Sequence, residues 1–155
     1  MEGIAQEALD VLQNKKQTVA VAESMTGGAL MKALITVPGA SASVLGGIVC
    51  YHTTLKTGLL GVSPDIIMTH GVVSQETASA MAEAIKDKTG ADIGLSTTGN
   101  AGPDLQGGSV KEVWIALSKG SETVTDHLVF SEDIERTDAI DEAVRSALQL
   151  LINHA

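Results

Sequence analysis

Ser24 is the first residue whose type and position suit chemistry on an acyl group. It stands in "VAVAESMTGG", where a short apolar run meets a helical pattern. The first N–H groups of a helix lack intrahelical partners, so the amides around Met25 to Gly28 suit an oxyanion or a phosphate. Gly27 and Gly28 would let a ligand approach the backbone closely. The alternative is that Ser24 or Thr26 only caps the helix.

A serine nucleophile needs a base, and Lys56 is one candidate. Lys56 stands in "YHTTLKTGLLGV", on a short helix whose other side is apolar, and Tyr51 ends the preceding strand. A strand end and the helix after it can direct Tyr51 and Lys56 at one spot. Lowering the pKa of a lysine from its ordinary value to about 7 costs roughly 4 kcal/mol, which burial would have to supply. The alternative is an ordinary solvated lysine.

Histidines are the other candidate bases. No local signature ties any of the four to Ser24, and each is more typical of a surface or half-buried residue; they are His52, His70, His127 and His154. A glycine-rich loop, "STTGNAGPDLQGG", follows an apolar strand and suits the floor of a ligand site. This loop lacks the lysine and the spacing of a Walker P-loop. The alternative is that it forms only a long surface turn.

Composition narrows the class of protein. The 155 residues suit one domain, residues 1–155, and with only 2% aromatics the core must be aliphatic. A net charge of −9 with scattered basic residues excludes nucleic acid as the main partner. Cys50 is the only cysteine, which excludes an internal disulfide and a multi-cysteine zinc site. No apolar run approaches the ~20 residues of a membrane span, so we expect a soluble, cytoplasmic protein without a membrane partner.

Hydrophobic periodicity predicts alternating helices and strands. Strands are expected at 18–22, 46–52, 91–99, 111–118 and 123–130, and helices at 3–14, 26–36, 53–60, within 61–71, at 75–89 and from Glu132 onward. Thr53 and Ser74 are expected N-caps, and Gly90 a helix end. The order predicts an α/β fold, a three-layer α/β/α sandwich with a mixed, mainly parallel sheet.

Several segments together resemble one family. "AESMTGG", "PGAS", "GGIVCYHTTLKTGLLGV", "GVVSQETASAMAEAI", "TTGNAGP" and "GG" are similar, in order and spacing, to the C-terminal domain of CinA proteins and to the nicotinamide-nucleotide amidases. The resemblance covers about residues 4–152. It implies hydrolysis of nicotinamide mononucleotide to nicotinate mononucleotide and ammonia, without metal or cofactor, by a homo-oligomer.

The resemblance also implies roles for residues. Ser24 would be the nucleophile, and Lys56 and Tyr51 would assist proton transfer. The substrate-binding residues would come from the serine turn and the glycine loop: Glu23, Thr26, Gly27 and Gly28, then Thr98, Gly99, Asn100, Ala101 and Gly102.

Three departures from the family pattern bear on the substrate. Met25 stands where the family usually has cysteine, and the stretch after the second glycine pair is shorter. Ile134 and Asp138 stand where the family has arginines, and an arginine there would suit a ligand phosphate. Arg136 would substitute only from a shifted register. Two alternatives to the nucleotide amidase therefore stay open: a non-catalytic nucleotide-binding or regulatory module, and an amidase for another small amide.

Overall fold

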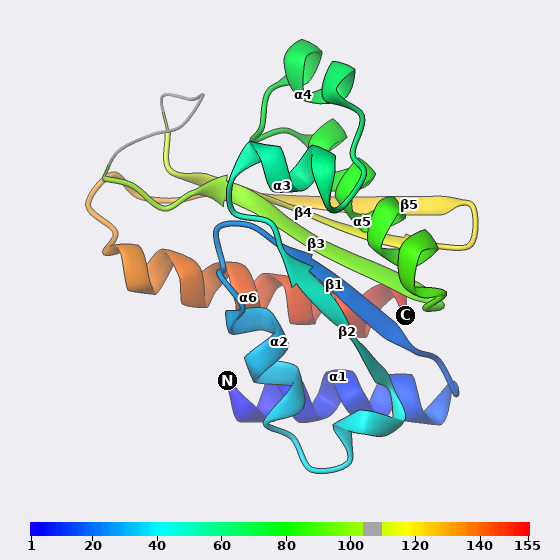
Figure 1. Ribbon diagram of the computed structural model, residues 1–155. Helices are drawn as coiled ribbons and strands as arrows, with labels where there is room; N and C mark the ends of the chain where they lie inside the picture. Colours follow the sequence, from blue (N-terminus) through cyan, green and yellow to red (C-terminus); the bar gives the residue numbers. More distant parts are fainter. Residues whose placement is uncertain (104–109) are drawn as a thin grey trace.

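Five strands form one mixed sheet in the order β2-β1-β3-β4-β5 (Figure 1). The structure, a computed structural model, describes residues 1–103 and 110–155. The strands are β1 (Val19–Glu23), β2 (Val44–Val49), β3 (Ile93–Asn100), β4 (Glu112–Lys119) and β5 (Glu122–Val129). β1 pairs in parallel with β2 and β3, whereas β4 pairs antiparallel with both β3 and β5. The carboxyl ends of the three parallel strands therefore meet at one edge, where ligand sites of α/β sheets form.

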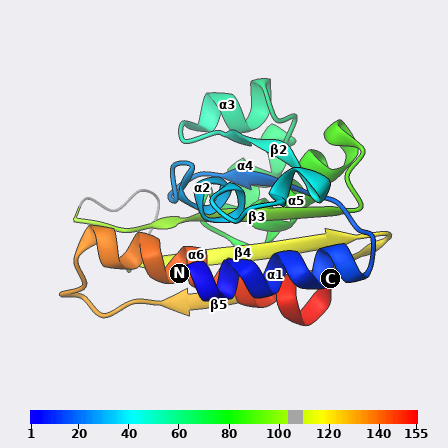
Figure 2. The same cartoon turned by 90° about the horizontal axis from the view of Figure 1, so that it is seen from below.

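Helices cover both faces of the sheet (Figures 1 and 2). On one face lie α1 (Glu2–Asn14), α2 (Ala29–Ile35) and α6 (Arg136–His154); the other is covered by α5 (Gln75–Thr89), beside α3 (Thr53–Gly58) and α4 (Pro64–His70). A short 3₁₀ turn, Ala40–Ala42, precedes β2. The predicted α/β/α sandwich is confirmed.

Alternation along β1 divides the core between the two faces. Val19 and Val21 join the cluster under α1, α2 and α6, while Ala20 and Ala22 join the cluster under α5. On the second face, α5 approaches β3 closely at Gly94. A Cβ on Gly94 of β3 would lie only 2.0 Å from the Ala82 carbonyl oxygen of α5, so a glycine is needed where that helix crosses the strand.

Some predicted boundaries were wrong. β2 ends at Val49, so Tyr51 lies beyond the strand rather than at its end. His52, not Thr53, is the N-cap of α3, because its side chain accepts a hydrogen bond from the Thr54 amide. The last helix begins at Arg136 instead of near Glu132. Ser74 and Gly90 bound α5 as predicted.

Candidate active site

The serine turn occupies residues 24–28, between β1 and α2. The Ser24 amide donates to the Thr97 carbonyl of β3 at 3.1 Å, which carries the sheet pairing one residue past the end of β1. Gly27 and Gly28 have φ values of +58° and +101°, in the left-handed region that glycine adopts most readily. The turn therefore leaves the sheet abruptly and holds Ser24 at the edge where the parallel strands end.

Glu23 fixes this turn from beneath. Its carboxylate is fully buried and accepts hydrogen bonds from the Thr26 hydroxyl at 2.6 Å and from the amides of Gly28, Leu30 and Met31 at 3.2, 2.9 and 3.0 Å. The last three donors belong to the start of α2, whose amides lack intrahelical partners and whose dipole favours a negative charge. The geometry thus gives Glu23 a structural task, the capping of α2, although the family resemblance implied substrate binding.

The amides available to an oxyanion are fewer than the sequence suggested. The Gly27 amide donates to the Ser24 carbonyl at 3.1 Å, and the Gly28 amide to Glu23. Within the described residues, the amides of Met25 and Thr26 have no such intramolecular acceptor. These two N–H groups, beside Ser24, are the candidates for stabilising negative charge on a bound carbonyl oxygen.

Lys56 lies against Ser24. Its amine is 2.8 Å from the Ser24 hydroxyl oxygen, and it donates to the backbone carbonyls of Cys50 at 2.9 Å and Tyr51 at 3.1 Å. The side chain is fully buried. All three neighbours are neutral oxygen atoms. They suit both forms of the amine: three N–H donors when it is charged, or two donors and a lone pair toward the serine when it is neutral.

Burial lowers the pKa of Lys56, because a desolvated ammonium is disfavoured; the interaction with Cys50 opposes this shift. Burial also raises the pKa of the Cys50 thiol, so this neighbour is uncharged at neutral pH. The Ser24–Lys56 pair therefore combines a short contact with an amine whose pKa is lowered, which are two features that serine activation by a base requires.

Tyr51 and Arg136 lie at the mouth of the same site. The Tyr51 side chain is half exposed, and its phenol oxygen accepts a hydrogen bond from Arg136 Nη2 at 3.0 Å. Arg136 Nη1 donates to the Gly102 carbonyl at 2.5 Å. Tyr51 contacts Lys56 through its backbone carbonyl, while the hydrogen-bond partner of its phenol is Arg136. Its role in proton transfer stays a prediction.

A small hollow connects these groups. It measures about 20 Å³, room for about one water molecule, and is lined by Ser24, Met25, Tyr51, Val72, Gly99, Asn100, Ala101 and Arg136. Gly99 is required by close packing: a Cβ there would lie 2.2 Å from the Glu112 carbonyl oxygen and 2.5 Å from the Met25 sulfur. Met25 is accommodated at the family's cysteine position partly because Gly99 has no side chain.

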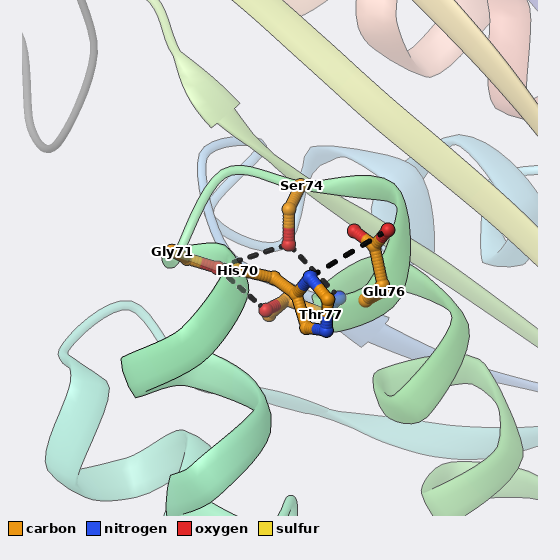
Figure 3. Close-up of polar contacts among 5 residues, drawn as sticks. All are labelled: His70, Gly71, Ser74, Glu76 and Thr77. Carbon is orange, nitrogen blue, oxygen red and sulfur yellow. Dashed lines mark hydrogen bonds and ion pairs between the residues drawn. The ribbon is translucent and has the colours of Figure 1, made fainter.

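The turn between α4 and α5 contributes Val72 to the lining of the hollow, and polar contacts hold this turn in place (Figure 3). The Gly71 carbonyl accepts from the hydroxyls of Ser74 and Thr77 at 3.0 and 2.7 Å, and Ser74 in turn accepts from the Thr77 amide at 3.1 Å. The Thr98 hydroxyl donates to the Val72 carbonyl at 2.9 Å. These bonds fasten the start of α5 to β3 and so hold Val72 at the hollow.

In the structure, the substrate-binding residues predicted on the glycine loop and the serine turn fall into three groups. Gly99, Asn100 and Ala101 line the hollow, and Gly102 borders it through Arg136. Thr26 and Thr98 are buried, with their hydroxyls engaged in protein hydrogen bonds. Gly27 and Gly28 shape the turn. Gly107 and Gly108 of the predicted loop lie outside the described residues.

No histidine contacts Ser24 within the described residues. His52 caps α3, and His70 and His127 face the carboxylates of Glu76 and Glu112.

Two residues at the hollow, Arg136 and Val72, were not predicted from the sequence. Arg136 was considered only as a substitute from a shifted alignment, and Val72 is an apolar residue whose type does not indicate a site.

In the part of the chain that is described, no three histidine, cysteine or acidic side chains gather as a metal site, and no helix is long and apolar enough to cross a membrane.

Comparison with known proteins identifies the family of the chain. Residues 1–155 match the family described as the CinA C-terminal domain. The chain belongs to the CinA C-terminal domain family. A CinA-like protein of Myxococcus xanthus is 39% identical over 99% of the chain, and one of Frankia casuarinae 42% identical over 97%. The chain spans only 37% and 34% of the length of these two relatives.

Solved structures of CinA relatives share the fold. The competence or damage-inducible protein from Enterobacter asburiae superposes with a TM-score of 0.93 at 28% identity, covering 98% of this chain and 96% of that one. The competence/damage inducible protein CihA from Agrobacterium tumefaciens gives 0.91 at 32% identity, covering 98% and 93%. The CinA C-terminal fold therefore covers 98% of this chain.

Proposed function

We propose that this CinA domain is an amidohydrolase that converts nicotinamide mononucleotide to nicotinate mononucleotide and ammonia. The observation that carries the proposal is the 2.8 Å contact between the Ser24 hydroxyl and the fully buried Lys56 amine. A surface lysine would be charged at neutral pH and unable to accept a proton. Burial lowers the pKa of Lys56 from its ordinary value and so favours the neutral amine that can accept a proton.

In the first half-reaction, neutral Lys56 accepts the proton of the Ser24 hydroxyl as its oxygen attacks the carboxamide carbon. The carbonyl oxygen becomes an oxyanion, for which the amides of Met25 and Thr26 are the candidate donors. The Lys56 ammonium then returns a proton to the departing nitrogen. The C–N bond breaks, ammonia leaves, and Ser24 carries the acyl group as an ester.

In the second half-reaction, water attacks the ester carbon while Lys56 accepts a proton from it. The Ser24–acyl bond breaks, the serine recovers its proton from Lys56, and the carboxylate product leaves. Both steps require neutral Lys56. Hydrolysis is therefore expected to rise with pH as Lys56 loses its proton, at a pH below the ordinary lysine pKa.

The test is an assay of ammonia release from nicotinamide mononucleotide by the pure protein and three variants. Ser24→Ala removes the nucleophile and Lys56→Met the base, and each is expected to lower kcat by at least about 10³-fold. Ser41→Ala, at an exposed serine, is the matched control and should retain full activity. An inactive wild type, or a Ser24→Ala variant as active as the wild type, would refute the proposal.

A non-catalytic nucleotide-binding module is the second candidate. It is supported by the residues that stand at the two positions where the family has arginines. Ile134 is half-buried against the core, and Asp138 is exposed in the first turn of α6. Neither can hold a phosphate. Calorimetric binding of the nucleotide without release of ammonia would favour this candidate. An amidase for a different amide would instead release ammonia from other members of a substrate panel.

A further inference from the structure

Thr97 of β3 interrupts an apolar run on one face of the sheet. Successive residues of a strand point to opposite faces, so Thr97 shares its face with Ile93 and Leu95, which pack in the core cluster under α1, α2 and α6. Thr97 is fully buried. A valine of the same shape would continue this core without a polar group to satisfy, because a buried hydroxyl costs free energy unless it forms a hydrogen bond. The contacts of the hydroxyl must therefore explain why it is there.

The hydrogen bond of the Thr97 hydroxyl has a fixed direction. Thr97 Oγ1 lies 2.8 Å from Thr26 Oγ1, and Thr26 Oγ1 donates its one proton to Glu23 Oε1 at 2.6 Å. That carboxylate oxygen also accepts from the amides of Gly28 and Leu30, so it acts as an acceptor. Because the proton of Thr26 is already used, Thr97 must be the donor between the two threonines. The bonds thus run in one direction, from Thr97 through Thr26 to Glu23.

Thr97 holds the serine turn on both sides of the candidate oxyanion donors. Its carbonyl accepts from the Ser24 amide at 3.1 Å, and its hydroxyl donates to the Thr26 side chain. The amides of Met25 and Thr26 lie along the chain between these two attachments. An oxyanion donor is effective only where it is already aimed at the charge that develops. Because both attachments come from one residue of β3, the strand determines how these amides are oriented.

We infer that Thr97 is a positioning residue, which acts through Thr26 to aim the amides of Met25 and Thr26 at the oxyanion of the tetrahedral intermediate. The inference rests on the proposed function for the chemical step, but it assigns a task to a residue that does not line the hollow. Neighbouring Thr98 is turned to the other face, where its hydroxyl donates to the Val72 carbonyl. Consecutive threonines of β3 therefore fasten two walls of the hollow separately.

The turnover test compares Thr97→Val, which keeps the shape of the side chain and removes the hydroxyl, with the wild type on nicotinamide mononucleotide. A misplaced oxyanion donor weakens binding of the transition state but not of the substrate. We therefore expect kcat to fall by about 10-fold and KM to change by less than about twofold. Thr97→Ser retains the hydroxyl and should recover most of the loss.

The matched control for turnover is Ser96→Ala, on the same strand. It removes another fully buried hydroxyl, which donates to the Ala78 carbonyl of α5 at 2.6 Å. Loss of this hydrogen bond destabilises the fold without touching the serine turn. Ser96→Ala should therefore leave kcat unchanged at a temperature where both variants are folded.

A second measurement needs no turnover of an amide. In the reaction with a fluorophosphonate, the Ser24 oxygen bonds to phosphorus, Lys56 takes the proton, and fluoride leaves as the P–F bond breaks. The P=O oxygen takes up negative charge during this step, so the same amides are tested. Mass spectrometry measures the rate at which the protein gains the adduct, with Ser24→Ala as the unlabelled reference. We expect Thr97→Val to react about 10-fold more slowly than the wild type, and Thr97→Ser and Ser96→Ala within about twofold of it.

The two measurements separate this inference from the proposed function. Slower labelling of Thr97→Val in a protein that releases no ammonia would support the inference and refute only the amidase. Three results would overturn the inference: no labelling of Ser24 in the wild type, labelling of Thr97→Val at the wild-type rate, or an equal loss of rate in Ser96→Ala. The last result would mean that lost stability alone slows the reaction.

Discussion

At the scale of single residues, the site depends on one buried amine. Lys56 is fully buried, yet its contacts are a hydroxyl and two carbonyls instead of a carboxylate. Such an arrangement destabilises the charged amine and costs folding free energy whenever the amine is protonated. Selection for fold stability alone would favour an apolar side chain at this position, so the lysine is best explained by chemistry.

The pH dependence of stability tests this view of Lys56. The unfolded chain has the higher lysine pKa, so between the lowered folded pKa and about 10.5 the unfolded state binds more protons, and stability rises with pH through this window. Lys56→Met removes the titration. The stability of Lys56→Met relative to the wild type should therefore be greatest at pH values below the folded pKa of Lys56. This difference should shrink as the pH rises toward about 10, because the wild type gains stability over that range.

Urea denaturation of both proteins at several pH values measures that difference. Lys32→Met, at an exposed lysine of α2, is the matched control and should give a difference that does not change with pH. A pH-independent difference for Lys56→Met would mean that the amine keeps its ordinary pKa, and the proposed base would lose its physical support.

At the scale of secondary-structure elements, the serine is positioned by the capping of α2. This short helix has no side-chain bond from its N-cap residue, Gly28. Glu23, at the end of β1, supplies the acceptor instead and so couples strand, turn and helix in one group of hydrogen bonds. The turn that carries Ser24 is therefore fixed at both ends.

Glu23→Gln tests this coupling. The amide side chain keeps one acceptor oxygen, loses the negative charge at the helix start, and places N–H donors against backbone N–H donors. We expect a loss of about 2–4 kcal/mol in the free energy of unfolding, measured by denaturation, and reduced ammonia release because Ser24 is displaced. Glu7→Gln, at an exposed position of α1, should change neither quantity. Unchanged stability in Glu23→Gln would show that the cap is dispensable.

At the scale of the whole molecule, the site joins segments that are far apart in the chain. Ser24 follows β1, and Tyr51 and Lys56 come from the segment after β2. Gly99 and Asn100 end β3, Ala101 follows it, and Arg136 begins α6. Only the folded sheet brings these segments together. A ligand that contacts several of them binds the native state but not the unfolded chain, so binding must stabilise the whole fold.

Thermal unfolding of Ser24→Ala with nicotinamide mononucleotide measures this linkage. At a ligand concentration about 100 times its dissociation constant, stabilisation is about 2.7 kcal/mol, which for a chain of this size corresponds to a rise in Tm of about 5 to 10 °C. A Tm that does not depend on nucleotide would contradict a site assembled from these segments.

Much of the fold could be predicted because its signals are local. Hydrophobic periodicity found every strand to within a few residues, and the caps of α5 followed from Ser74 and Gly90. The errors fell where tertiary contacts override local preference. His52 caps α3 and Thr53 does not. The segment 132–135, predicted as helical, remains outside α6, and its Glu132 and Ile134 carbonyls accept hydrogen bonds from Lys111.

The sequence by itself determined that the chain is an aliphatic α/β domain and that Ser24 begins a turn suited to an acyl site. It could not determine whether Lys56 is buried, because the same short helix carries a solvated or an enclosed lysine depending on what packs over it. From the sequence, Glu23 was predicted to bind the ligand. Arg136 was considered only as a substitute from a shifted alignment with the family's arginines. Tertiary structure decided all three, since burial and hydrogen-bond partners depend on contacts between segments that local sequence does not encode.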